Sequence, residues 1–133
     1  MPTHVITYPP GGGSCGNGGN NEFWYVVKLG DGYDAFELAY GGNVMCANVQ
    51  GSSYQNGTDI LSWPCNNTVT PNEQWRRPEN TPDPYISNHY YIVPAQDWGL
   101  TWNVAGGLGS GRQIILYSQC NCDNDAWSFS SIN

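Results

Sequence analysis

The chain has 133 residues, and its eleven Asp and Glu against four Lys and Arg give a net charge of −7. So few basic residues cannot build a surface that follows a phosphate backbone or an anionic lipid layer, so neither nucleic acid nor membrane is an expected partner. Aromatic residues form 14% of the chain, which predicts a folded core, and one domain over 1–133 is expected for this length.

Short apolar or aromatic runs alternate with clusters of Gly, Asn, Pro and Asp along the chain. No segment carries a 3.6-residue apolar period over ten residues, so no amphipathic helix is predicted. Strands are predicted near 4–8, 22–29, 34–40, 43–50, 59–65, 73–79, 85–95, 99–104, 113–119 and 125–132. Many short strands with regular turn signals indicate an all-β sandwich or barrel.

No apolar stretch is long enough to cross a membrane, so no membrane insertion is expected. The first ten residues lack the basic and apolar regions of a secretory leader. The expected location is cytoplasmic, or secreted without a signal peptide, unless the chain is a mature form. Five cysteines leave at least one thiol unpaired within the chain.

An Asn-x-x-Trp motif occurs three times, at intervals of 51 and 52 residues. Its tryptophans are Trp24, Trp75 and Trp127. Each motif follows an apolar strand that ends in an aromatic residue, and these aromatics are Tyr8, Trp63 and Tyr117. Further upstream, Cys46-Ala47-Asn48-Val49 matches Thr101-Trp102-Asn103-Val104. This periodicity predicts one supersecondary unit copied around an axis.

The motifs resemble the ricin-B-type β-trefoil lectins, a family of small lectins and lectin-like proteins whose repeat ends in Gln-x-Trp. The resemblance covers essentially the whole chain and implies a β-trefoil with pseudo-threefold repeats at about 1–29, 30–80 and 81–133, here called the first, middle and third lobes. The first repeat begins at its third strand and is therefore abbreviated. The resemblance also implies that the three motif tryptophans fill the core. Glu22, Glu73 and Asp125 replace the family's Gln.

The resemblance implies a sugar site in a lobe that has an amide or carboxylate after its second strand, an aromatic ring ending its third strand, and an Asn in the next turn. Sugars stack C–H groups on such a ring and offer hydroxyls to fixed polar groups. The implied residues are Asn48, Trp63, Asn72 and Glu73 in the middle lobe, and Asn103, Tyr117, Asn124 and Asp125 in the third lobe.

Two alternatives stay open for these residues. An Asn in a turn is equally compatible with local turn chemistry. Trp98 and Trp102 either line the third-lobe site or pack beneath it.

Asn48 and Asn103 replace the Asp that the family carries, and an amide accepts hydrogen bonds less strongly than a carboxylate. The implied glycans are therefore of the galactose or N-acetylgalactosamine type, the family default, or of the mannose type.

The resemblance implies a disulfide between Cys46 and Cys65 in an oxidising compartment, and two buried thiols in the cytosol. Only His4 and His89 are available as imidazole ligands, so neither a metal nor another cofactor is expected. No nucleophile motif appears, so the chain is not expected to be an enzyme.

The leading hypothesis is a lectin, with a homodimer as a possible assembly. The alternative is a trefoil that does not bind sugar and acts as a protein-binding accessory subunit or a protease inhibitor.

Overall fold

A computed structural model describes residues 3–4, 24–40, 42–66, 68–79, 89–107, 112–120 and 123–129. The predictions for Tyr8, for the loop at 9–21, for Glu22 and for the start of the strand at 85–95 lie outside the described residues. Among the described residues, no helix is long and apolar enough to cross a membrane.

Nine short strands follow one another along the described chain. They are β1 (Thr3–His4), β2 (Tyr25–Lys28), β3 (Asp34–Tyr40), β4 (Asn43–Val49), β5 (Ile60–Pro64), β6 (Trp75–Arg76), β7 (Val93–Pro94), β8 (Leu100–Val104) and β9 (Ile114–Ser118). Four 3-10 turns separate them: η3 (Gly30–Gly32), η4 (Gln50–Ser52), η5 (Pro71–Glu73) and η6 (Asp123–Asp125).

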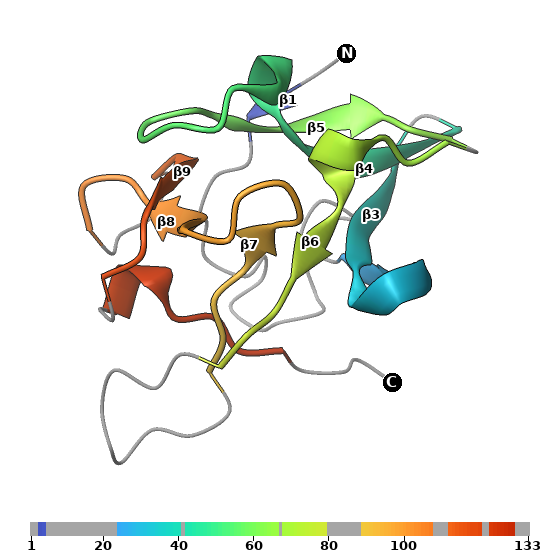
Figure 1. The fold of residues 1–133 in the computed structure, drawn as a ribbon. Helices are drawn as coiled ribbons and strands as arrows, with labels where there is room; N and C mark the ends of the chain where they lie inside the picture. Colours follow the sequence, from blue (N-terminus) through green and yellow to red (C-terminus); the bar gives the residue numbers. More distant parts are fainter. Residues whose placement is uncertain are drawn as a thin grey trace.

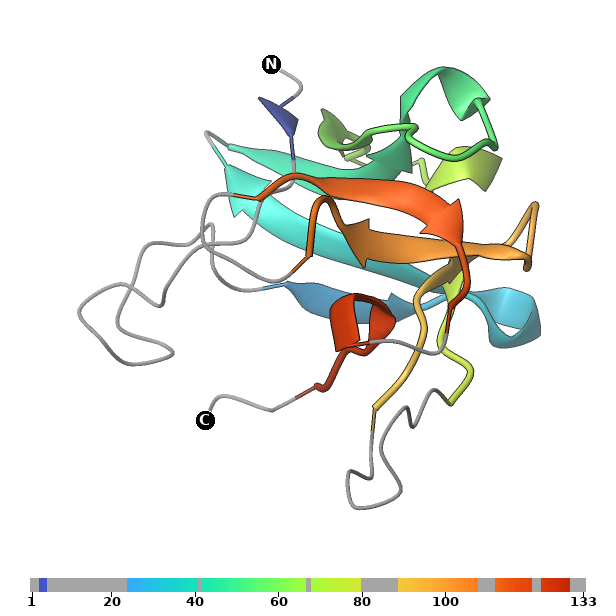
Figure 2. The ribbon, with the colours of Figure 1, turned by 90° about the vertical axis from the view of Figure 1, so that its left-hand side faces the viewer.

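All strand pairs are antiparallel, and they form two sheets. One sheet has the order β1-β5-β4-β3-β6-β7, with β2 also paired to β3, and the other is the β8–β9 pair. Strands β6 and β7 lie between the β3–β5 region and the β8–β9 pair (Figure 1). In the perpendicular view of Figure 2, η6 (red) lies beside the β8–β9 ribbon (orange).

The turn after the second strand begins in the same way in the middle and third lobes. Gly51 and Gly106, each two residues after a buried Val, have φ angles of 61° and 76°. Glycine adopts such left-handed angles without a steric penalty. The residue before each glycine donates its backbone N–H across the hairpin, at 3.1 Å to the Asp59 carbonyl and at 2.9 Å to the Gln113 carbonyl. The backbone therefore repeats at the first two residues after each second strand, as the sequence motifs predict.

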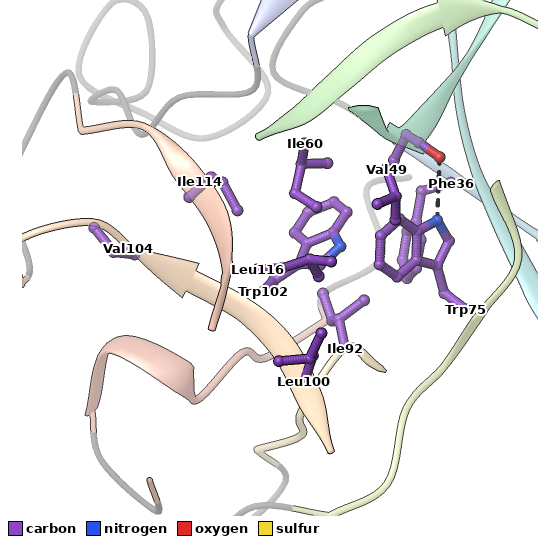
Figure 3. Packing of buried hydrophobic residues seen from close by; sticks show 11 residues of the cluster. Phe36, Val49, Ile60, Trp75, Ile92, Leu100, Trp102, Val104, Ile114 and Leu116 are labelled. Carbon is purple, nitrogen blue, oxygen red and sulfur yellow. Dashed lines mark hydrogen bonds between the residues drawn. The ribbon is translucent and has the colours of Figure 1, made fainter. Parts of the chain in front are cut away.

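Four tryptophans meet in the core. The Trp102 ring makes edge contacts with Trp24, Trp75 and Trp127, at centroid distances of 6.2, 5.5 and 5.9 Å (Figure 3 shows Trp75 and Trp102). Trp75 is fully buried, and Trp24 and Trp127 are partly buried against the same cluster. The predicted core role of the three motif tryptophans is confirmed, and of the two alternatives for Trp102 the structure shows core packing.

Three predicted strands are shorter or absent. The described part of the strand at 85–95 contains only the two residues of β7. The strand at 73–79 is reduced to β6, and its predicted start is occupied by η5, which ends at Glu73. The strand predicted at 125–132 was wrong over its described part: η6 ends at Asp125, and Trp127 forms an isolated bridge with Tyr90. The indole anchors this segment instead, since Trp127 Nε1 donates to the Trp102 carbonyl at 3.1 Å.

Candidate functional site

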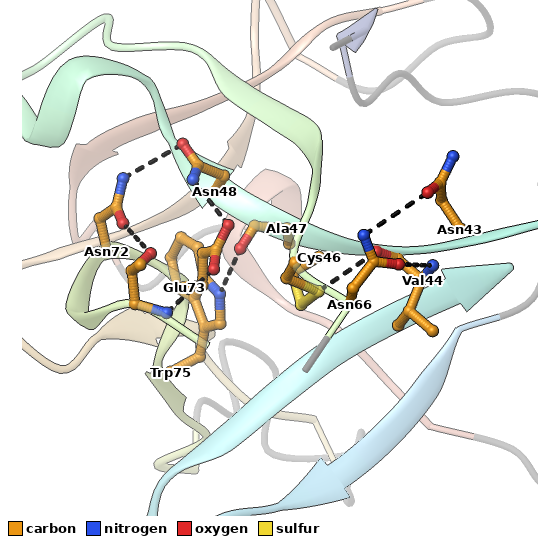
Figure 4. The surroundings of a disulfide bond; sticks show 11 residues. Asn43, Val44, Cys46, Ala47, Asn48, Asn66, Asn72, Glu73 and Trp75 are labelled. Carbon is orange, nitrogen blue, oxygen red and sulfur yellow. Dashed lines mark hydrogen bonds between the residues drawn. A yellow bond between two sulfur atoms is a disulfide. The ribbon is translucent and has the colours of Figure 1, made fainter. Parts of the chain in front are cut away.

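In the middle lobe, η5 places two polar side chains against the end of β4. Asn48 Nδ2 donates to Glu73 Oε2 at 2.8 Å (Figure 4). Asn72 Nδ2 donates both to Asn48 Oδ1 at 3.2 Å and to the Val49 carbonyl at 2.9 Å. The structure therefore joins three of the four predicted middle-lobe residues in one hydrogen-bonded cluster, with Asn72 nearest to solvent.

The third lobe builds the same cluster with its own residues. Asn103, on β8, donates from Nδ2 to Asp125 Oδ1. Asn124 Nδ2 donates to the Val104 carbonyl at 3.2 Å, which matches the bond from Asn72 to Val49. Three of the four predicted third-lobe residues again lie together at the end of the second strand.

The two carboxylates lie behind the asparagines rather than at the surface. Glu73 is 1% exposed and Asp125 is 0% exposed. The second oxygen of each accepts a backbone N–H, from Thr70 at 3.0 Å and from Cys120 at 3.0 Å. With both oxygens engaged inside the protein, these carboxylates orient the asparagines and reach a ligand only through them. Burial raises the pKa of Asp125, and hydrogen bonds from Asn103 and Cys120 offset part of that rise.

The fourth residue of each set is an exposed ring. Trp63 is 45% exposed and Tyr117 is 46% exposed, in contrast to the buried tryptophans of the core. Trp63 pairs with Cys46 across β4 and β5, and Tyr117 pairs with Thr101 across β8 and β9. Side chains two residues apart on a strand share a face, so each ring lies on the same hairpin face as the asparagine of its lobe.

A covalent link joins β4 to the residue that follows β5 in the middle lobe. Cys46 and Cys65 form a disulfide with an S–S distance of 2.03 Å, in line with the pairing implied for an oxidising compartment. Glu37 lies near both sulfurs, but sulfurs in a disulfide offer no thiolate to a metal. In the third lobe Thr101 replaces Cys46, and its hydroxyl donates to the Ile92 carbonyl at 3.1 Å.

One contributor to the site was missed by the sequence reasoning. Thr70 and Glu73 form a capping box around η5, which fixes the turn that carries Asn72. The signal is visible in the sequence as Thr-x-x-Glu, the usual pattern of this motif. This pattern gives Glu73 a structural role in the turn, which does not require contact with a ligand.

A comparison with solved structures finds a designed threefold-symmetric protein, ThreeFoil, which is 25% identical to this chain with a TM-score of 0.74. The match covers 97% of this chain and 81% of the designed one. Together with the repeated turns and clusters, it shows that the chain has the all-β, β-trefoil fold that the sequence predicts. No protein-family model and no curated protein matches the chain.

Proposed function

We propose that this protein is a carbohydrate-binding protein with two shallow sites, one at Asn48, Trp63 and Asn72 and the other at Asn103, Tyr117 and Asn124. The observation that carries the proposal is the repetition. Two lobes each place a half-exposed aromatic ring on the face of an asparagine that a buried carboxylate holds in place. An exposed ring beside oriented amides offers a sugar both a stacking surface and hydrogen bonds.

The hydrogen-bond inventory of the middle lobe predicts weak binding. Both Asn72 N–H groups and one Asn48 N–H group are already donated within the protein. One Asn48 N–H and a few oxygen lone pairs remain for a sugar. Affinity for a monosaccharide of the galactose, N-acetylgalactosamine or mannose type should then be around millimolar, or about −4 kcal/mol. Two sites on one chain, or a homodimer, would raise avidity for clustered glycans.

The same inventory favours a second candidate function. Asparagine side chains whose N–H groups mostly donate within the protein are compatible with a trefoil that has lost sugar binding. Exposed Trp and Tyr side chains are also frequent anchors of protein interfaces. The second candidate is therefore a protein-binding accessory subunit or protease inhibitor.

The disulfide supports secretion over a cytoplasmic location. Disulfides persist in oxidising compartments and are rare in the cytosol. Cys46 and Cys65 are both buried, and their bond closes a separation of 19 residues. Two glycosylation sequons, at Asn56 and Asn66, stand at exposed positions and are meaningful only for a secreted chain.

A glycan array with the wild type and a Trp63→Ala/Tyr117→Ala double variant tests the proposal. The wild type should bind a set of glycans and the double variant should bind none of them, because each site loses its stacking ring. Tyr25→Ala is the matched control, since Tyr25 is a 69% exposed aromatic on β2, a strand that carries no residue of either cluster. Wild-type binding by the double variant would reject these sites. No binding by the wild type would favour the protein-binding function.

A further inference from the structure

A separate cleft lies at the β6–β7 side of the molecule. Trp98, on the turn between β7 and β8, is 53% exposed. The Arg76 guanidinium lies 4.2 Å from the centroid of its ring. With Glu79, Tyr91 and Gln119, these two side chains line a cleft of about 300 Å³, at the lower end of the range for small-molecule sites. None of these residues belongs to the two asparagine clusters.

Two neighbouring arginines at this cleft have different interaction partners. Arg77 pairs with Asp34 through a 2.9 Å contact between Nε and Oδ2. Among the described residues Arg76 has no such carboxylate partner, and its guanidinium contacts the Trp98 ring. The chain has eleven acidic and four basic residues, so Arg76 is one of only a few cationic side chains that could attract an anionic ligand. Arg76 also borders a second cleft of about 490 Å³, which contains the Arg77–Asp34 pair.

The Trp98 ring is held in place before any ligand arrives. Its Nε1 donates to the Ala95 carbonyl at 3.2 Å, and its own carbonyl accepts from Gln119 Nε2 at 2.6 Å. Asp97 Oδ1 accepts the backbone N–H of Gly99 at 3.0 Å and fixes the turn on both sides of the ring. A preorganised ring loses little conformational entropy when a ligand stacks on it.

We propose that this cleft binds a saccharide unit that bears a carboxylate. The carboxylate pairs with the Arg76 guanidinium, the sugar ring stacks on the exposed part of Trp98, and hydroxyls bond to Glu79 and Gln119. Guanidinium and carboxylate match in geometry and form charge-assisted hydrogen bonds. The Glu79 carboxylate and the net charge of −7 disfavour polyanions such as nucleic acid, whereas a single carboxylate can turn toward Arg76 and away from Glu79.

The test compares two probes that differ only at C6, methyl β-D-glucuronide and methyl β-D-glucoside. Each is titrated into isotope-labelled protein, and the indole N–H signal of Trp98 is followed by NMR. The wild type should bind the glucuronide about tenfold more tightly than the glucoside, because only the glucuronide forms the charged pair. Equal affinities, or no shift at Trp98, would overturn the proposal.

Matched variants separate this cleft from the two lobe sites. Arg76→Gln keeps a polar side chain, removes the charge and should abolish the preference for the glucuronide. Lys28→Gln removes one charge from an exposed position on β2 and should leave that preference intact. The Trp63→Ala/Tyr117→Ala variant should also retain it, whether or not the lobe sites bind glycans. Loss of the preference in that double variant, or its survival in Arg76→Gln, would contradict the assignment.

Discussion

The middle and third lobes hold equivalent asparagines in place but stabilise their surroundings differently. Asn48 and Asn103 both donate to a buried carboxylate. The middle lobe anchors β4 beside that asparagine with the disulfide from Cys46, whereas the third lobe uses hydrogen bonds between Thr101 and Ile92. The polar cluster is therefore the repeated unit, whereas the interactions that hold the strand beneath it differ between the lobes.

The lobes also differ at the residue before each asparagine. Trp75 Nε1 donates to the Ala47 carbonyl and Trp127 Nε1 to the Trp102 carbonyl, each at 3.1 Å, so Ala47 and Trp102 occupy equivalent positions. The small side chain leaves the centre of the core open, and the large one fills it. Among the described residues, Trp102 Nε1 is a buried nitrogen without a hydrogen-bond partner, so Trp102 contributes through packing.

The largest expected effect comes from removing the Trp102 side chain, by which the third lobe differs from the middle lobe in the core. Trp102→Ala would make the third lobe resemble the middle lobe and leave a cavity that three tryptophans line. The free energy of unfolding should fall by about 3–5 kcal/mol, measured by chemical denaturation. Trp63→Ala, at an exposed ring, is the control and should cost far less. Similar losses in both variants would contradict the central position of Trp102.

The next effect removes the disulfide of the middle lobe. A Cys46→Ala/Cys65→Ala variant loses a cross-link over 19 residues, which should cost about 3 kcal/mol of unfolding free energy. The middle lobe should loosen first, so amide hydrogen exchange should accelerate in β4 and β5 while β8 and β9 keep most of their protection. Uniform acceleration in all four strands would show that the lobes do not differ locally.

A smaller effect tests the carboxylates that the lobes share. Glu73→Gln presents an amide N–H to either Asn48 or the Thr70 backbone, and both of these are donors. One buried donor is then left without an acceptor, which should cost about 1–3 kcal/mol of unfolding free energy. Asp125→Asn should have the same effect beside Asn103 and Cys120. Denaturation curves that match the wild type would show that neither carboxylate orients its asparagine.

The smallest effect depends on pH and concerns Asp125. Burial raises its pKa above the ordinary value of 3.8, so the folded protein binds this proton more tightly than the unfolded chain. The resulting stabilisation is complete below pH 3.8 and is lost as pH rises through the higher folded-state pKa. The free energy of unfolding should therefore fall more steeply with pH in the wild type than in Asp125→Asn over that interval. Parallel pH profiles would contradict this assignment.

The fold was predictable because its signals are periodic. Three Asn-x-x-Trp motifs and two matched second strands place the core tryptophans and the polar clusters without any long-range information. The position of Trp102 was not predictable from that pattern, because its repeat equivalent is a small alanine. Contact with all three motif tryptophans appears only when the lobes are arranged in space.

The site was predictable in composition but not in the roles of its members. Sequence position alone could not separate an exposed Trp63 from a buried Glu73, since both fall within one predicted site. Burial makes Glu73 a positioning residue, and its capping box with Thr70 explains why a carboxylate is suited there. The Arg76–Trp98 contact joins residues 22 positions apart from two lobes, so no local motif indicates it.

The central claim is that the middle and third lobes carry equivalent and independent sugar sites. NMR titration of the wild type and of Trp63→Ala with galactose, N-acetylgalactosamine and methyl mannoside tests it most directly. In the wild type, the side-chain amide signals of Asn72 and Asn124 should both shift with one of these sugars. In Trp63→Ala, Asn124 should still respond while Asn72 no longer does. Absence of any response in the wild type, or loss of both responses in the variant, would contradict the claim.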